Sequence, residues 1–480
     1  MNRRMVLSTI GKILKIESIL LLLPLIVSVI YKENSIFSFL ITSAVTFILG
    51  TLATLIAKPR TDVIYAREGF IIVSLAWLFM SLFGALPFVI SGEIPSFVDA
   101  FFETISGFTT TGASILNNVE ALGKATLFWR SFTHWIGGMG VLVFLMAFSK
   151  SLSGRSIHIM RAEVPGPVVG KIVPRVKDTA KILYFIYIAL TFIQIIVLWC
   201  GEMNLYESIV HSFATAVTGG FGIKGDSVGG YSVYSQWVIA IFMLLFGVNF
   251  NLYYLALVKK IKTAIKSTEL WVYIGIIVIS SIVISLNIYS SFDSVSETIR
   301  TAFFQTSSII TTTGFSTVDF NLWPGMAKAV IVVLMFIGAS AGSTGGGLKV
   351  SRVMILVKTI KREIKKLLHP RSVSSVSFEG KPLDETTING VATYFVFYVM
   401  CIIFAFMLIS FEPFGFECNF IAAVSCFNNI GPSFGIAGPA GSFAEYCDFS
   451  KIILSFAMLF GRLEIFPMFI TILPSTWKRN

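Results

Sequence analysis

The sequence is poor in charge, cysteine and histidine, and each shortage argues against a class of function. Charged residues make up 13% of the 480 residues, whereas soluble domains carry about 25%. The five cysteines show no CxxC spacing and the four histidines form no HExxH pattern, so the sequence predicts neither a disulfide framework nor a zinc site. No cluster of acid, base and metal ligands is visible, and we expect no enzymatic activity.

Apolar residues are abundant instead. They make up 55% of the chain, and the mean hydropathy is +0.82, which is typical of a protein that crosses the membrane many times. The net charge of +11 does not indicate nucleic-acid binding, because the basic residues lie between apolar runs, as the positive-inside rule describes. Lipid is therefore the expected surrounding, and no nucleic acid is expected as a partner.

A short motif occurs four times. TTTGAS at 109–114 returns as TTTGFS at 311–316, and related motifs are VTGGF at 217–221 and NIGPS at 429–433. Each follows an aromatic-rich run of about ten residues, too short to cross a bilayer but long enough for a re-entrant half-helix. Four copies of helix, half-helix, loop and helix predict a pseudo-fourfold pore.

The predicted fold is an all-α polytopic membrane protein, with two N-terminal membrane helices and four pseudo-symmetric repeats around a central pore. The predicted divisions are the N-terminal helix pair at 1–57 and repeats one to four at 58–150, 151–259, 260–366 and 367–480. Ten membrane spans are expected near 9–31, 36–57, 70–90, 126–149, 180–200, 235–258, 270–289, 326–358, 390–411 and 450–473.

Charge indicates the orientation. The connections 150–181, 259–269 and 349–381 are rich in lysine and arginine, including Lys171 and Arg175, and belong in the cytoplasm. An even number of spans then places both termini there. The opposite connections are acidic, either as ordinary solvated loops or as acid gathered around the pore mouth, where it would raise the local cation concentration.

The repeated motif suits a monovalent cation. Backbone carbonyls can replace the water around such an ion and still release it, and glycine permits the strained backbone that this requires. The half-helices would direct their partly negative C-terminal ends toward the ion. One Thr-Gly pair is an ordinary turn, but four in phase with the hydropathy predict a lined passage. The carbonyls expected to point inward are those of Thr110, Thr111, Thr312 and Thr313.

A run of small residues interrupts the span near 326–358, and no other span shows such a break. It contains Gly338, Ser340, Gly342, Ser343, Thr344, Gly345, Gly346 and Gly347. Close helix packing is one interpretation; we favour a flexible loop below the filter that blocks or clears the pore.

Arg462 lies in the last span, where a charge is costly and normally faces a pore or a partner. A pair with Glu464 is disfavoured, because residues two apart on a helix do not face each other. We expect Arg462 to touch the loop at 338–347 and to repel a waiting cation.

Together these motifs resemble the membrane subunit of Trk potassium uptake systems, in the Trk/Ktr/HKT superfamily. The resemblance implies a potassium-selective filter in which Gly112, Gly219, Gly314 and Gly431 are the four glycines. It adds Val217, Thr218, Asn429 and Ile430 to the residues that supply carbonyls. It also assigns the gate to the glycine-rich loop, which runs to Lys349, and to Arg462.

The resemblance further implies potassium as the transported substrate, a bacterial cytoplasmic membrane, a homodimer, and a cytosolic ring of regulatory subunits that bind NAD or adenine nucleotides. No organic cofactor is expected on this chain itself, because the GxGxxG match at 220–225 lacks the strand–turn–helix context of a dinucleotide site. The basic segments 171–181 and 349–371 either dock the ring or only set the topology.

Two mechanisms stay open. The favoured one is channel-like flow driven by the membrane potential, since no span carries an obvious carboxylate relay. Glu464 is the one deep candidate, and Glu17 is expected nearer the cytoplasmic end. The alternative is a proton- or sodium-coupled secondary transporter, either a potassium symporter or an organic-solute carrier.

Overall fold

The computed structural model describes residues 2–58, 65–138, 140, 176–372 and 374–478, which form helices and one short β-hairpin. The α-helices are α1 (Arg3–Leu20), α2 (Leu22–Tyr31), α3 (Ile36–Ile56), α4 (Ala66–Gly84), α5 (Leu86–Ser91), α6 (Phe97–Phe108), α7 (Lys124–Gly138), α10 (Val176–Trp199), α11 (Leu205–Ala216), α12 (Val233–Gly247), α13 (Phe250–Leu257), α14 (Ile261–Ile265), α15 (Thr268–Ile288), α16 (Val295–Ile310), α17 (Gly325–Ile337), α18 (Val350–Leu368), α19 (Glu385–Ile409), α20 (Phe416–Phe427), α21 (Asp448–Arg462), α22 (Phe466–Ile472) and α23 (Pro474–Trp477). Single 3-10 turns are η1 (Val119–Ala121), η2 (Tyr289–Ser291), η3 (Phe320–Leu322) and η4 (Gly435–Ala437), and the antiparallel hairpin consists of β1 (Ser377–Phe378) and β2 (Lys381–Pro382).

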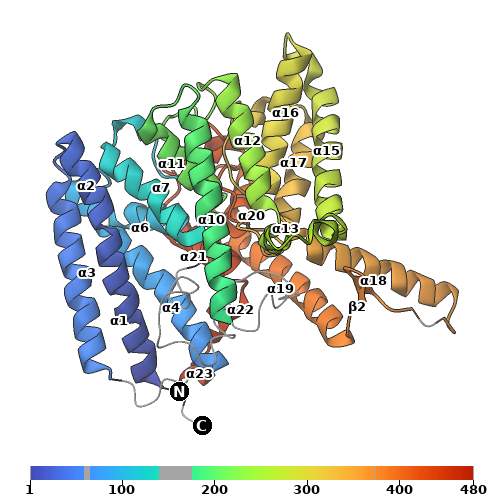
Figure 1. Cartoon of the computed structure of the whole chain (residues 1–480), viewed down its shortest axis with the longest axis horizontal. Coiled ribbons are helices and arrows are strands. Elements are labelled where there is room, and N and C mark those ends of the chain that lie inside the picture. Colours follow the sequence, from blue (N-terminus) through green and yellow to red (C-terminus); the bar gives the residue numbers. More distant parts are fainter. Residues whose placement is uncertain (1, 59–64, 139, 141–175, 373, 479–480) are drawn as a thin grey trace.

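Six helical segments of the described chain are long and apolar enough to cross a membrane without a sharp bend: Arg3–Tyr31, Ile36–Ile56, Arg67–Ser91, Lys181–Trp199, Thr268–Ser291 and Glu385–Ile409. The first two are the predicted N-terminal pair. Their helices α1 and α3 lie side by side (Figure 1). Gly11 and Gly50 make this approach possible, because a side chain on either would lie 2.7 Å from the carbonyl oxygen of the other. Small residues at such a crossing are the usual means of helix packing in lipid.

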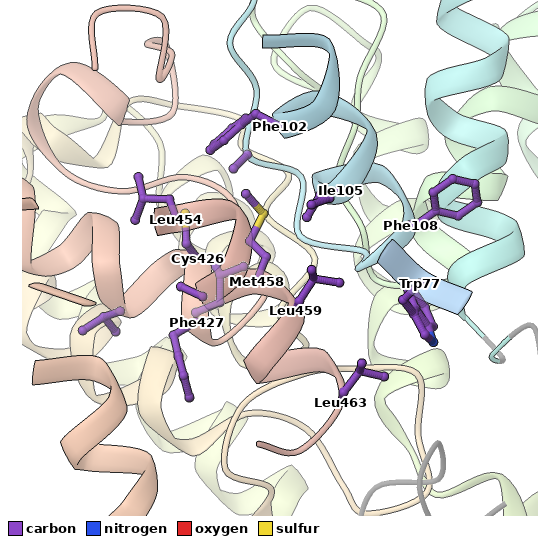
Figure 2. Packing of buried hydrophobic residues seen from close by; sticks show 14 of the residues in the cluster. Trp77, Phe102, Ile105, Phe108, Cys426, Phe427, Leu454, Met458, Leu459 and Leu463 are labelled. Carbon is purple, nitrogen blue, oxygen red and sulfur yellow. The ribbon is translucent and has the colours of Figure 1, made fainter. Parts of the chain in front are cut away.

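The four half-helices are α6, α11, α16 and α20, and they are arranged in a ring. The helix that follows each of them packs against the next half-helix along the chain: α7 on α11, α12 on α16 and α17 on α20. Helix α21 closes the ring by packing on α6, and Figure 2 shows its Met458 and Leu459 between Ile105 of α6 and Cys426 of α20. The chain is therefore an all-helical membrane protein with a fourfold arrangement of re-entrant segments.

Acidic residues mark the N-terminal end of every half-helix. Asp99, Glu207, Glu297 and Glu417 each lie in the first turn, where a negative charge is favourable beside the positive end of the helix dipole. In α11 the carboxylate also completes a capping box with Asn204. Much of the acid in the outer connections therefore serves helix N-termini.

The prediction that only one span is broken is wrong. Helices α12 and α13 meet at 88°, α21 and α22 are separated by three residues, and α17 and α18 by the glycine-rich loop. The cause is crowding at the half-helices: side chains on Gly137 and Gly461 would collide with the carbonyl oxygens of Phe108 and Phe427, the last residues of α6 and α20. The span expected at 126–149 is described only to residue 140, and Lys171 and Arg175 lie outside the described residues.

Both ends of the described chain lie next to each other on one side of the molecule (Figure 1). The guanidinium of Arg3 donates to the carbonyl of Trp477 at 3.2 Å, and that of Arg67 donates to the carbonyls of Ser475 and Lys478, each at 3.0 Å. Helix α18 extends away from the body of the molecule. The boundaries between the four repeats stay predictions.

Candidate functional site

Each half-helix ends in the same backbone turn. The first residue of the turn has a left-handed backbone: Thr110 (φ 56°), Thr218 (φ 54°), Thr312 (φ 59°) and Asn429 (φ 56°). Its amide donates to the carbonyl three residues back, and the next amide donates to the carbonyl five residues back, as in Thr110–Gly107 (3.1 Å) and Thr111–Ser106 (2.9 Å). This is the Schellman ending of a helix. Glycine usually takes the left-handed position, so threonine there is strained.

The position of the turn shows which glycine of the second motif is equivalent to Gly112. Two residues after the left-handed residue comes a glycine with positive φ, namely Gly112 (80°), Gly220 (80°), Gly314 (86°) and Gly431 (103°). Gly220, and not Gly219, therefore occupies the position of Gly112. Gly219 and Thr218 correspond to Thr111 and Thr110, and Val217 falls one residue before the turn.

The four turns meet around one axis. A side chain on Gly112 would collide with the carbonyl oxygen of Gly219, one on Gly220 with that of Thr313, one on Gly314 with that of Ile430, and one on Gly431 with that of Thr111. Each glycine thus touches the carbonyl that precedes the glycine of the next copy, and the circle closes after four contacts. Gly112, Gly220, Gly314 and Gly431 also line a single cavity of about 140 Å³.

The charged residues that line this cavity are basic. They are Arg130 and Lys224, and no described lining residue carries a carboxylate. Nearby acids are engaged elsewhere: Glu103 is paired with Arg130 at 2.7 Å, and Asp99 with Lys451 at 2.6 Å. The acidic pore mouth stays a prediction: no described carboxylate lines the cavity itself, but Glu120 accepts from the amide of the lining residue Gly225 at 3.3 Å.

Hydroxyl groups support the turns from behind. The side-chain oxygens of Thr109 and Thr111 lie 2.8 Å apart, and those of Thr311 and Thr313 lie 2.7 Å apart. Asn429 connects the fourth turn to the first, because its side-chain amide donates to Thr111 Oγ1 at 2.9 Å. The two threonine pairs brace the first and third turns internally, and the Asn429 contact holds the fourth turn against the first.

The glycine-rich loop lies directly against the turns. The amide of Gly346 donates to Thr312 Oγ1 at 2.6 Å, and side chains on Gly345 and Gly346 would press on the carbonyl oxygens of Thr311 and Asn428. Gly338, Gly342 and Gly347 have φ values of 74°, 70° and 73°. The loop can therefore approach the backbone of two half-helix ends because the residues at the two contacts, Gly345 and Gly346, carry no side chains.

Arg462 joins this loop to another repeat. Its guanidinium donates to the carbonyl of Thr344 at 3.0 Å and to those of Gly137 and Gly138 at 2.8 Å. The expected contact between Arg462 and the loop is thus present. Glu464 is not its partner; that carboxylate binds Arg352, near the start of α18.

Three further groups hold the loop from the side opposite the turns. The ammonium group of Lys349 donates to the carbonyl of Gly345. The amide of Ala341 donates to the carboxylate of Glu269 at 2.7 Å, and the amide of Phe250 donates to the carbonyl of Gly342 at 3.1 Å. The loop is therefore tied to α13, α15 and α18 as well as to Arg462. Ser343 is buried within it, and its hydroxyl donates to the carbonyl of Ser340 at 2.7 Å.

Comparison with known proteins identifies the family. A family model described as "TrkH: Cation transport protein" matches residues 35–478. The chain belongs to the TrkH family. It is 36% identical to the Trk system potassium uptake protein TrkH of Escherichia coli K12 over the full length of both chains, and 33% identical to TrkG of the same strain over 99% of each chain. The crystal structure of the potassium transporter TrkH from Vibrio parahaemolyticus has a TM-score of 0.89 and 32% identity, and it covers both chains completely.

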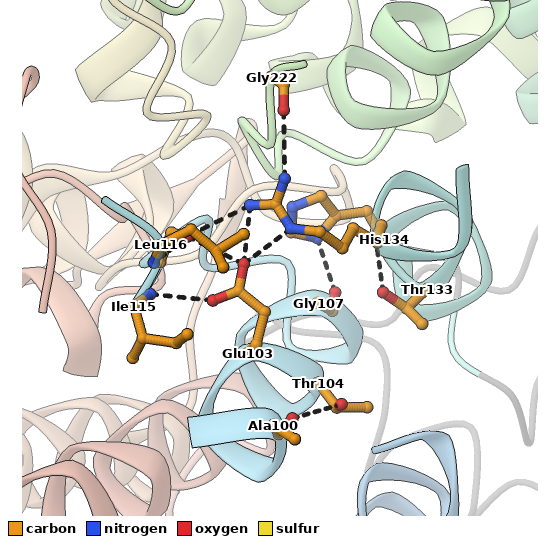
Figure 3. A network of polar contacts seen from close by, with 11 residues as sticks. Ala100, Glu103, Thr104, Gly107, Ile115, Leu116, Thr133, His134 and Gly222 are labelled. Carbon is orange, nitrogen blue, oxygen red and sulfur yellow. Dashed lines mark hydrogen bonds and ion pairs between the residues drawn. The ribbon is translucent and has the colours of Figure 1, made fainter. Parts of the chain in front are cut away.

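Sequence reasoning missed four residues of this TrkH-family site. Gly220 is one, and the Gly-Phe pair at 220–221, which repeats that at 314–315, was the signal for it. The others are Glu103, Arg130 and His134, which lie behind the first and second turns (Figure 3). They are spread over two helices, and nothing in their spacing indicates that the fold brings them together.

Proposed function

We propose that this chain carries potassium into the cell through the ring of four backbone turns. The observation that carries this proposal is the closed circle of contacts among Gly112, Gly220, Gly314 and Gly431. Relatives of the chain are named potassium uptake proteins, and the family match is consistent with the same substrate here. A neutral ring of carbonyls suits a cation that must bind and then leave.

In the proposed filter the ion replaces its water with backbone oxygens from each turn. The corrected set is Thr110, Thr111 and Gly112; Thr218, Gly219 and Gly220; Thr312, Thr313 and Gly314; and Asn429, Ile430 and Gly431. Four half-helix C-termini add their partial negative charge. The filter is short, so we expect weaker discrimination between potassium and sodium than a filter with more carbonyl layers would give.

We assign the gate to the loop at 338–347 with Lys349 and Arg462. The loop lies against two half-helix ends, and the guanidinium of Arg462 lies beside it, where a positive charge opposes a cation. Opening would require the loop to give up its bonds to Arg462, Glu269 and Thr312. Ala339, Ser340 and Thr344 of the loop are buried, so opening would also have to repack these side chains.

The membrane potential is the proposed driving force, since an inside-negative 100 mV contributes about 2.3 kcal/mol per charge. One observation favours the alternative of proton coupling. Glu17 is fully buried, and neither of its carboxylate oxygens has a hydrogen-bond partner among the described residues. It lies in the 29-residue span Arg3–Tyr31, and its depth in the membrane stays a prediction.

We further propose that the chain forms a homodimer in a bacterial cytoplasmic membrane, with both termini in the cytoplasm, and that a cytosolic ring of NAD- or adenine-nucleotide-binding subunits controls the gate. Support comes from α18, which follows the gate loop, leaves the body of the molecule and carries Lys358, Lys361, Lys365 and Lys366. The predicted docking segments are 171–181 and 349–371, and residues 171–175 of the first lie outside the described residues.

Growth of bacteria that lack their own potassium uptake tests the substrate. Cells that express this chain should grow at low external potassium and should accumulate rubidium but not amino acids or sugars. Accumulation of an organic solute without rubidium would show that the chain is a solute carrier.

A further inference from the structure

A buried carboxylate supports the first turn from behind. Glu103 of α6 is 1% exposed, and it accepts hydrogen bonds from Ser114 Oγ and from the amide of Ile115, both at 2.9 Å. Ser114 and Ile115 are the second and third residues after Gly112. Glu103 therefore fixes the segment of the first turn that leaves the filter on the outer side.

The partner of Glu103 extends this support to the second turn. Arg130 of α7 is 2% exposed and donates to Glu103 Oε1 at 2.8 Å through Nε. A second nitrogen of its guanidinium donates to the carbonyl of Gly222 at 3.3 Å, and the group lies 4.1 Å from the ring of Phe221. The ion pair thus contacts the residues that follow Gly112 in the first turn and Gly220 in the second (Figure 3).

His134 lies on the other side of the same turn. Its Nδ1 lies 2.7 Å from the carbonyl oxygen of Gly107 in α6, and its ring lies 4.2 Å from that of Phe221. Its ring also fills the space beside Gly219, where a side chain would come within 2.6 Å of the imidazole. Phe221 is therefore held between Arg130 and His134.

The other repeats build the same turn without this ion pair. Seven residues before the left-handed residue, repeat one has Glu103, whereas the others have His211, Gln305 and Ala422. Arg130 lies seven residues before Gly137. Gly461 is the equivalent of Gly137 in repeat four, and the residue seven positions before it is Leu454. The apolar pair Ala422 and Leu454 in repeat four shows that the turn can form without the charges. Stability alone therefore does not explain the ion pair, since a buried ion pair often adds little stability.

We propose that Glu103 and Arg130 are positioning residues that determine ion specificity, because they keep the first and second turns from closing around an ion smaller than potassium. This inference rests on the proposed function. Discrimination by a ring of carbonyls depends on how far they can move, and groups behind a site set that freedom. The contacts of Ser114, Ile115 and Gly222 with the pair limit movement at two of the four turns.

The test is the ratio of rubidium to sodium permeability in proteoliposomes that contain the purified full-length chain. Glu103→Gln leaves the shape but removes the charge, and Arg130→Lys keeps the charge but removes the fork of donors. Ser114→Ala is the smallest change: it removes the hydroxyl that donates to Glu103 at 2.9 Å and accepts from Arg130 at 3.3 Å. We expect each single variant to lower the permeability ratio about threefold or more while rubidium flux persists. The double variant E103Q/R130Q should recover part of that loss, because it leaves no unpaired charge.

Glu297→Gln is the matched control. It is the same substitution in another half-helix, where the carboxylate pairs only with Arg300 on a more exposed surface at 3.7 Å, and it should leave the ratio unchanged. If Ser114→Ala or every folded ion-pair variant conducts with the wild-type ratio, the inference is wrong. Ser114→Ala keeps the test decisive if the charge variants fail to fold, since an unchanged ratio in that variant alone overturns it. If neither the wild-type chain nor Arg462→Ala carries rubidium under any condition, the proposed function is overturned instead.

Discussion

Thr110, Thr218, Thr312 and Asn429 hold a backbone conformation that costs a non-glycine residue about 1–3 kcal/mol. Two of these side chains bond to neighbouring segments. Thr312 accepts a bond from the glycine-rich loop at 2.6 Å, and Asn429 donates to the first turn. At these two positions the strained residue therefore joins its turn to a neighbour.

Gly314→Ala tests the circle of contacts at its third glycine. A methyl group there would meet the carbonyl of Ile430, and the positive φ adds about 1–2 kcal/mol for an L-residue. We expect selective rubidium flux to fall to background, measured in proteoliposomes. Gly325→Ala is the control, since it lies at the start of α17 with no atom within 4 Å of the added group, and an alanine in a helix gains about 0.5–1 kcal/mol. Equal loss in both variants would argue against a special role for Gly314.

Glu17→Gln separates passive flow from proton coupling. An uncompensated charge in the membrane core is costly, so we expect Glu17 to be protonated and the neutral amide to replace it without loss of flux. Rubidium uptake is measured with and without an inward proton gradient. Uptake that requires the gradient in the wild type and is lost in Glu17→Gln would support the coupled transporter instead.

At these positions the sequence predicted the motif but not its register. Gly219 and Gly220 are adjacent, and only backbone geometry tells which one has positive φ and which one makes room for His134. The contacts of Glu103 and Arg130 depend on packing between α6 and α7, for which a single sequence carries no signal.

At the scale of elements, the gate loop is held by its neighbours. Glu269→Ala removes the acceptor for the amide of Ala341, a loss of about 1 kcal/mol for one hydrogen bond, which corresponds to a roughly fivefold larger open population. We expect rubidium flux through the chain alone to rise accordingly. Glu269→Gln keeps an acceptor oxygen and should stay near the wild-type flux. A rise in both variants, or in neither, would show that this contact does not hold the gate.

The continuous spans were predictable from hydropathy, and the broken ones were not. Residues 233–257 carry no charged residue, yet α12 and α13 meet at 88°, with Asn249 as the N-cap of α13. The break follows from contacts between the second helix of a repeat and the half-helix ends. Glycine in the sequence marks a possible break, but the partner that enforces it comes from the fold.

At the scale of the whole molecule, the labelling of natural cysteines tests the orientation of the chain in the membrane. Cys200 follows α10, Cys447 precedes α21, and both are exposed. A membrane-impermeant maleimide should label them in intact cells, because both lie on the side opposite α18. Lys365→Cys, introduced on α18 with Cys200 and Cys447 replaced by serine, should react only after permeabilisation. The reverse pattern would invert the topology and place the proposed gate on the outer side.

The central claim is that this chain alone forms a potassium-selective pore closed by its own loop and Arg462. The most direct measurement is rubidium and sodium flux into proteoliposomes with wild-type chain and Arg462→Ala. Charge-assisted hydrogen bonds contribute about 1.5–3 kcal/mol each, so we expect the variant to raise rubidium flux about tenfold or more, with sodium carried less well. Arg300→Ala, a partly buried arginine of α16 whose ion-pair partner is Glu297, should have no such effect. If both wild type and Arg462→Ala stay silent until a proton gradient or another protein is supplied, the account of a self-contained gated pore is contradicted.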